Sequence, residues 1–128
     1  MPKKKIFIAD DREEVLSMLK ELLTSKGFEV MVSKEPEQLL KLIKNFEPHL
    51  ILLDLLMPDL DGFEICRMLN SDAEAQTIPI IIMSGLSDLV DIKRAYKLGV
   101  VGYLIKPFDL NTVVAEIQKA IANKESPQ

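Results

Sequence analysis

The stretch Leu50-Ile51-Leu52-Leu53-Asp54 decides the fold, because four consecutive apolar residues run directly into a carboxylate. A short continuous apolar run is typical of a strand covered on both faces of a parallel sheet. We therefore predict a central strand from His49 to Leu53. A carboxylate at the end of a buried strand costs several kcal/mol unless it has a partner. Asp54 therefore indicates a functional site.

Similar runs lie on both sides of this strand, at residues 6–9, 28–32, 79–83 and 100–105. Helical patterns separate them, with end signals at Gly27, Pro36, Asp61, Ser87 and Asp109. Strands that alternate with helices predict an α/β fold, with five parallel strands, right-handed crossovers and helices on both faces.

Length and composition predict one cytoplasmic domain. The chain has 128 residues, a net charge of −4 and a single cysteine, Cys66. This charge gives no reason to bind nucleic acid, and one cysteine allows no internal disulfide. The apolar runs are too short to span a membrane. We expect a domain over residues 1–122 and a short tail over 123–128, with no output domain.

Polar side chains follow four of the five predicted strands. Asp10 and Asp11 follow the first, Asp54 the third, Ser84 the fourth and Lys106 the fifth. In open α/β sheets, ligands bind outside the carboxyl ends of the strands. We therefore expect these five side chains to meet at one edge of the sheet.

Three carboxylates at such an edge need a cation. At ~4 Å each pair repels by roughly 1 to 4 kcal/mol, depending on the local dielectric constant. Oxygen ligands without histidine or thiolate favour Mg²⁺. His49 opens the central strand at its opposite end and Cys66 lies within a helix, so we exclude zinc. A carboxylate beside a metal, a lysine and a hydroxyl points to phosphoryl transfer onto Asp54.

Each of these residues also has a simpler interpretation. Asp10 and Asp11 could cap the helix that follows them. Lys106 could be a surface lysine, Ser84 a turn residue and Tyr103 a core residue. A group of basic residues in the helix after Ser87 is usually a solvated face, although it could contact an acidic partner; its members are Lys93, Arg94 and Lys97.

Taken in order along the chain, these motifs resemble the receiver domain of bacterial two-component response regulators. The resemblance covers residues 4 to 122 and rests on Asp10-Asp11, Asp54 with Pro58, Gly62, Ser84-Gly85, Tyr103 and Lys106-Pro107. It implies the flavodoxin-like doubly wound fold, with strand order 2-1-3-4-5.

The resemblance also implies a role for each acidic residue. Asp54 would accept a phosphoryl group from a sensor histidine kinase or a phosphotransfer protein. Asp11, Asp54 and the backbone carbonyl of Leu56 would bind Mg²⁺ directly, and Asp10 would act through water. The protein would not be an enzyme in the usual sense, because it would catalyse only its own phosphorylation and dephosphorylation.

The remaining motif residues would form the switch. Lys106 would pair with the phosphoryl oxygens, and the Lys106-Pro107 peptide would be cis. Ser84 would move toward the phosphate and Tyr103 would turn inward. Gly62, Gly85 and Pro58 would have structural roles beside the site. The surface of the last two helices and the strand between them would then bind a downstream target protein. The receiver itself would be a monomer or a phosphorylation-linked dimer.

Two positions depart from the polar variants of the family. Leu56 and Leu86 lie two residues after Asp54 and Ser84, where side chains help to position the hydrolytic water. Leucine cannot hydrogen-bond water, so we predict a long-lived phosphoryl group.

Three other functions compete with this one. A flavin carrier is disfavoured by the acidic loop after the first strand and by the absence of tryptophan. A phosphatase that uses an aspartyl phosphate would need a second acid where Leu56 stands. A phosphorylation-independent pseudo-receiver, which only binds proteins, remains the alternative.

Overall fold

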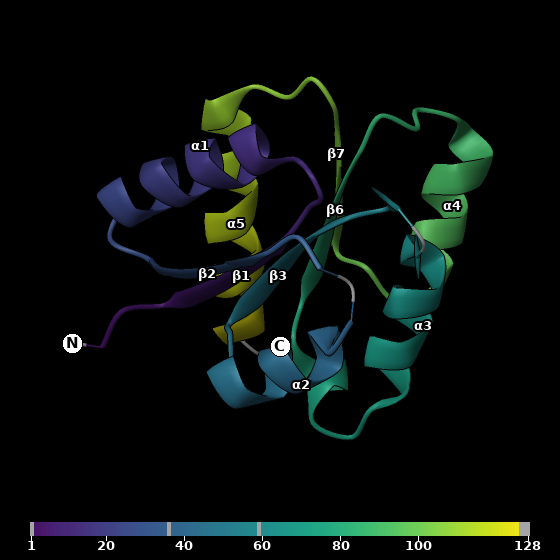
Figure 1. Cartoon of the computed structure of the whole chain (residues 1–128), viewed down its shortest axis with the longest axis horizontal. Helices are drawn as coiled ribbons and strands as arrows, with labels where there is room; N and C mark the ends of the chain where they lie inside the picture. Colours follow the sequence, from purple (N-terminus) through teal and green to yellow (C-terminus); the bar gives the residue numbers. More distant parts are fainter. Residues whose placement is uncertain (1, 36, 59, 126–128) are drawn as a thin grey trace.

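The protein is a doubly wound α/β domain, shown by a computed structural model that describes residues 2–35, 37–58 and 60–125 (Figure 1). Five parallel strands form the main sheet in the order β2-β1-β3-β6-β7. Their bounds are Lys5–Ala9 (β1), Glu29–Ser33 (β2), Leu50–Asp54 (β3), Ile80–Ser84 (β6) and Gly102–Ile105 (β7). Counted along the chain, this is the predicted order 2-1-3-4-5, with β3 in the centre.

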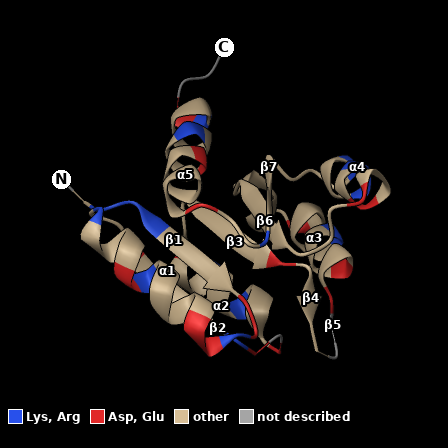
Figure 2. Ribbon diagram, turned by 90° about the horizontal axis from the view of Figure 1, so that it is seen from above, with Lys and Arg blue, Asp and Glu red and all other residues tan. Residues whose placement is uncertain are grey.

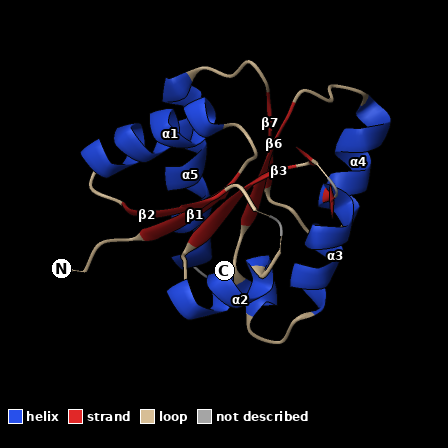
Figure 3. Ribbon diagram, viewed as in Figure 1, coloured by secondary structure: helices blue, strands red, loops and turns tan. Residues whose placement is uncertain are grey.

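Helices cover both faces of the sheet, as predicted (Figure 3). One face carries α1 and α5, and the other carries α2, α3 and α4. The bounds are Glu13–Ser25 (α1), Leu39–Phe46 (α2), Gly62–Ser71 (α3), Leu89–Lys97 (α4) and Leu110–Glu125 (α5). In β3, Leu50 and Leu52 pack against α1 and α5, while Ile51 and Leu53 pack toward the opposite helices. Successive side chains of a strand point to opposite faces, so the continuous apolar run supplies both cores.

Three of the predicted helix ends are confirmed. Gly27 follows α1 with φ +95°, a conformation that glycine adopts without strain. Asp61 caps α3, because its side chain accepts a hydrogen bond from the Phe63 N–H. Asp109 caps α5 by accepting from the Thr112 N–H at 3.3 Å.

Other predicted boundaries are wrong by a few residues. The residue that precedes α4 is Asp88 rather than Ser87. Val100 is not in β7, because its N–H bonds the carbonyl of Ala95 and closes α4 instead. At the other end of the fold, α2 begins only at Leu39, and Pro36 lies outside the described residues.

The last helix is longer than predicted. It continues to Glu125, through the Asn123 boundary at which we expected a tail. Its buried face includes Ile121, and Lys4 near the start of the chain pairs with Glu125. These contacts connect the end of α5 to the rest of the domain. The rest of the predicted tail, residues 126–128, lies outside the described residues.

Two short elements were not predicted. A two-stranded antiparallel hairpin, β4 (Leu56–Met57) and β5 (Leu60–Asp61), follows the central strand. A short 3₁₀ helix, η1 (Ala75–Thr77), precedes β6. Both are too short to show a hydrophobic period. Within the described ranges, no helix is long and apolar enough to cross a membrane.

Candidate phosphoacceptor site

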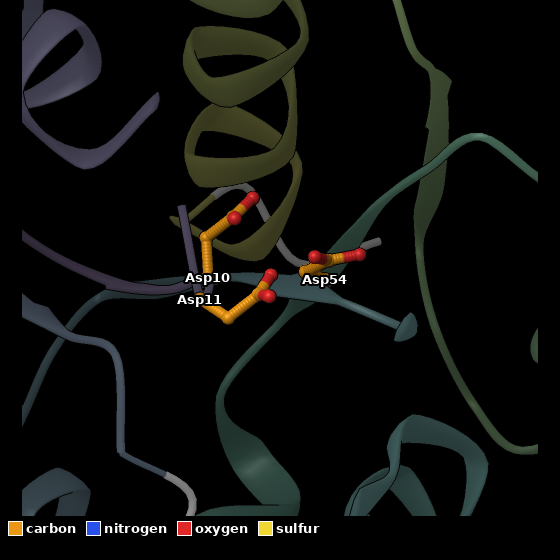
Figure 4. A group of neighbouring side chains, drawn as sticks. All are labelled: Asp10, Asp11 and Asp54. Carbon is orange, nitrogen blue, oxygen red and sulfur yellow. The ribbon is translucent and has the colours of Figure 1, made fainter. Parts of the chain in front are cut away.

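Three carboxylates meet at the carboxyl edge of the sheet (Figure 4). Asp54 ends β3, and Asp10 and Asp11 directly follow the neighbouring strand β1. One oxygen from each lies within 4.8 Å of one oxygen from each of the others. Adjacent parallel strands end side by side, which brings residues 43 positions apart in the chain together. The predicted proximity of the three acids is confirmed.

Lys106 neutralises part of this charge from the loop after β7. Its Nζ lies 2.6 Å from Asp10 Oδ2 and 3.4 Å from Asp54 Oδ2. Its backbone N–H donates to the Ser84 carbonyl at 2.7 Å, which fixes the start of the loop. The lysine side chain is 19% exposed, so its ammonium group lies at the edge of the site rather than in bulk water. The interpretation of Lys106 as an ordinary surface lysine is therefore wrong.

Asp54 is held in a position that disfavours its charge. It is 3% exposed, and burial is the main cause that raises the pKa of its carboxyl, with the nearby Asp10 adding to the effect. The Leu56 N–H, which donates to Asp54 Oδ1 at 3.0 Å, and Lys106 act in the opposite direction. The net effect is a raised pKa, because burial outweighs the hydrogen bond from Leu56 and the attraction of Lys106.

Asp10 is fully buried and both of its oxygens are engaged. Oδ1 accepts the Arg12 N–H at 2.9 Å, and Oδ2 accepts from Lys106. The first bond turns the chain toward α1, but the N-cap residue of that helix is Arg12. Asp11 is half-buried. Capping of α1 therefore does not account for the acidic pair.

The donor set fits a hard divalent cation. It consists of carboxylate oxygens, which suit Mg²⁺ and fail to select zinc or copper. The two residue types that typically bind zinc lie away from the cluster, as predicted. His49 accepts the Lys5 N–H through Nδ1 at the opposite end of the sheet, and Cys66 is fully buried in α3. The role of the Leu56 carbonyl as a metal ligand stays a prediction.

Ser84 and Tyr103 are linked through the backbone of Leu86. Ser84 is fully buried, and its Oγ accepts the Leu86 N–H at 3.0 Å. The Tyr103 hydroxyl donates to the Leu86 carbonyl at 2.7 Å, and its half-buried ring packs against the core. Burial raises the pKa of the Tyr103 hydroxyl. The sequence did not predict this link, because both hydrogen bonds use main-chain atoms of Leu86, which every residue type has.

Among the residues with predicted structural roles, the structure gives a steric reason for Gly62 but not for Gly85. A Cβ on Gly62 would lie 2.5 Å from Leu55 Cα, so only glycine permits this close approach of α3. A Cβ on Gly85 would meet nothing within 4 Å. The Lys106-Pro107 peptide is cis, as predicted, and Pro58 lies exposed in the turn after β4.

Comparison with known proteins agrees with this geometry. The family model for the response regulator receiver domain matches residues 6–118. A curated relative, "Probable transcriptional regulator ycf27" of Porphyridium aerugineum, is 32% identical over 134 residues, which cover 99% of this chain and 55% of the relative. The DNA-binding response regulator MtrA of Mycolicibacterium smegmatis is 29% identical over 123 residues, which cover 96% of this chain and 53% of the relative. The chain thus spans about half the length of the curated relatives it matches.

Solved structures give the same result. A two-component response regulator from Clostridium difficile superposes with a TM-score of 0.90 at 27% identity, covering 97% of this chain and all of the other. A CheY-like receiver domain protein from Methanospirillum hungatei shares the fold with a TM-score of 0.90, at 24% identity and with 97% and 98% of the two chains covered. From the family match, the sheet order and the acidic cluster beside Lys106, we conclude that this chain belongs to the response regulator receiver domain family.

Proposed function

We propose that Asp54 is the phosphoacceptor of a two-component phosphorelay and that the transfer requires Mg²⁺. One observation carries the proposal: three carboxylates and an ammonium group converge at the end of the central strand, with carboxylate oxygens within 4.8 Å and Lys106 in hydrogen-bond contact with Asp10. A structural ion pair would need only one acid for one lysine. The surplus negative charge supports a cation site beside a nucleophile.

The chemistry follows from the groups at the site. A carboxylate oxygen of Asp54 attacks the phosphorus of a phosphohistidine, the new P–O bond forms, and the P–N electron pair leaves with the imidazole. Lys106 offsets negative charge on the transferred oxygens, and the Ser84 hydroxyl can donate to one of them. A bound Mg²⁺, held by Asp11 and Asp54 with Asp10 nearby, would supply further charge neutralisation.

The proposed donors are a sensor histidine kinase or a phosphotransfer protein. The surface formed by α4, β7 and α5 is the proposed docking face for a downstream target, because large apolar side chains remain exposed there. They are Leu89, Val90, Tyr96, Val101 and Ile105. The free thiol of Cys66 fits the reducing cytoplasm, where we propose that the protein acts.

Measurement of intact mass tests the proposal. The protein is incubated with acetyl phosphate, with and without Mg²⁺, beside Asp54→Ala and Asp88→Asn. Asp88 is a matched control, because it is an exposed acid in the loop after β6 and is not one of the three clustered carboxylates. We expect a Mg²⁺-dependent gain of one phosphoryl group in the wild type and in Asp88→Asn, and none in Asp54→Ala.

A gain that persists in Asp54→Ala would contradict the assignment of the acceptor. No gain from acetyl phosphate or from a phosphorylated histidine kinase would favour the alternative, a phosphorylation-independent pseudo-receiver. In that case target binding should be equal with and without a phosphodonor.

A further inference from the structure

Few side chains anchor helix α4 to the domain. Among its described residues only Ala95 is fully buried, while Leu89 and Val90 in the first turn are 61% and 75% exposed. Asp88 precedes the helix without a side-chain capping bond. Each further side-chain contact between α4 and the rest of the domain therefore contributes strongly to the position of this helix.

Arg94 makes such a contact with α3. Its guanidinium carbon lies 4.0 Å from the centre of the Phe63 ring, within the range of a cation–π interaction. Figure 2 shows α3 and α4 next to each other at the same side of the sheet. Arg94 is exposed, whereas Phe63 is only 6% exposed and belongs to the core. Arg94 is therefore not a free member of the basic group that also includes Lys93 and Lys97.

Phe63 lies in the first turn of α3, which packs against the segment after Asp54. The neighbouring Gly62 N–H donates to the Leu55 carbonyl at 3.2 Å, and Gly62 leaves no room for a Cβ against the Leu55 backbone. The next amide, that of Leu56, donates to Asp54 Oδ1 at 3.0 Å. Two backbone contacts and one side-chain stack thus connect Arg94 to the acceptor carboxylate.

We propose that Arg94 is a positioning residue for the phosphoacceptor site. By stacking on Phe63, it braces the first turn of α3 against Leu55 and so holds the Leu56 amide on Asp54. The inference rests on the proposed function of Asp54 and adds a residue of α4 to it. Because coupling between two sites is reciprocal, a target protein that displaces Arg94 would also loosen the acceptor.

The test compares four variants with the wild type. Arg94→Met removes the cation, Arg94→Lys keeps the charge without the planar guanidinium, Phe63→Leu keeps apolar bulk without the ring, and Lys97→Met is the control on the same helix. Mg²⁺ alone is titrated while the amide resonance of Leu56 is followed by NMR, which reports the geometry of the site independently of any reaction. The rate of phosphorylation by acetyl phosphate is measured in parallel.

We expect Arg94→Met to weaken Mg²⁺ binding and to slow phosphorylation by about two- to five-fold, the range of an exposed cation–π contact. Arg94→Lys should show a smaller loss of Mg²⁺ binding and of phosphorylation rate than Arg94→Met, because it keeps the positive charge. Lys97→Met should match the wild type. Adding Arg94→Met to Phe63→Leu should do no more than Phe63→Leu alone, because the contact that Arg94 makes is already removed.

The inference would be overturned if Arg94→Met bound Mg²⁺ and were phosphorylated like the wild type. It would also be overturned if the fold-losses of Arg94→Met and Phe63→Leu multiplied in the double variant. Arg94 is exposed, so its variants fold even if Phe63→Leu does not, and the comparison with Lys97→Met then decides. A wild type that binds Mg²⁺ but gains no phosphoryl group would contradict the proposed function, while the titration would still decide the role of Arg94.

Discussion

Lys106 Nζ lies 2.6 Å from Asp10 Oδ2 and 3.4 Å from Asp54 Oδ2, so the lysine is bonded more closely to Asp10 than to the acceptor. Asp10 is fully buried, and its other oxygen accepts the Arg12 N–H. Lys106 therefore serves first to neutralise a buried acid. Its ammonium group still lies close enough to Asp54 to meet a group transferred there.

This relationship predicts the effect of removing the lysine. Lys106→Met should lower the free energy of unfolding by roughly 1 to 3 kcal/mol, because the buried Asp10 loses its charged partner. Asp10→Asn in the same protein should recover most of that loss. Urea unfolding of the single and double variants measures the effect. The pairing would be contradicted if Asp10→Asn lowered the free energy of unfolding by the same amount in Lys106→Met as in the wild type.

The carboxylate of Asp54 should destabilise the folded protein at neutral pH. Its folded-state pKa is raised, mainly by burial. The folded state therefore holds this proton more tightly than the unfolded state. Protonation of Asp54 therefore adds to the free energy of unfolding. This contribution is fully present below the ordinary carboxyl pKa of 3.8 and is lost as the pH rises through the pKa of the folded state.

Asp54→Asn should consequently be more stable than the wild type at pH 7 in a chelator, since the amide oxygen can still accept the Leu56 N–H. The advantage should shrink as pH falls and should also shrink when Mg²⁺ is added, because the cation stabilises only the carboxylate. Thermal melting across pH measures it. Equal stability of both proteins at pH 7 would show that the charge is already compensated.

The lifetime of the phosphoryl group should respond to Leu56 and Leu86. Neither side chain can hydrogen-bond a hydrolytic water, and the Leu56 side chain is 55% exposed, so a polar residue there should not affect folding. Leu56→Asn combined with Leu86→Gln should shorten the lifetime by about tenfold, or about 1.4 kcal/mol in barrier. Decay of the mass adduct checks this. Fast decay in the wild type that the substitutions leave unchanged would refute the idea.

Cys66 should be chemically inert in the folded protein. It is fully buried in α3, and burial raises the pKa of its thiol to about 12. The thiolate is the reactive form, so a disulfide reagent should label Cys66 only after unfolding in urea. Labelling of the native protein within minutes would show that α3 opens readily.

Much of the site could be predicted from the sequence because the polar residues end apolar runs. Asp54 and Ser84 are the last residues of β3 and β6, and Asp10 and Lys106 directly follow β1 and β7. In a parallel sheet this alone places them at one edge. The hairpin after Leu55 escaped prediction, since strands of two residues carry no periodic pattern.

The sequence by itself therefore determined the fold class, the strand order through a family resemblance, and the identity of the clustered acids. Only the tertiary structure decided which atoms meet. It paired Lys106 with Asp10, joined Ser84 to Tyr103 through the backbone of Leu86, and laid Arg94 on Phe63. The physical reason is that hydrophobic patterns act along one chain segment, whereas these contacts depend on side-chain reach and main-chain atoms from segments brought together by packing.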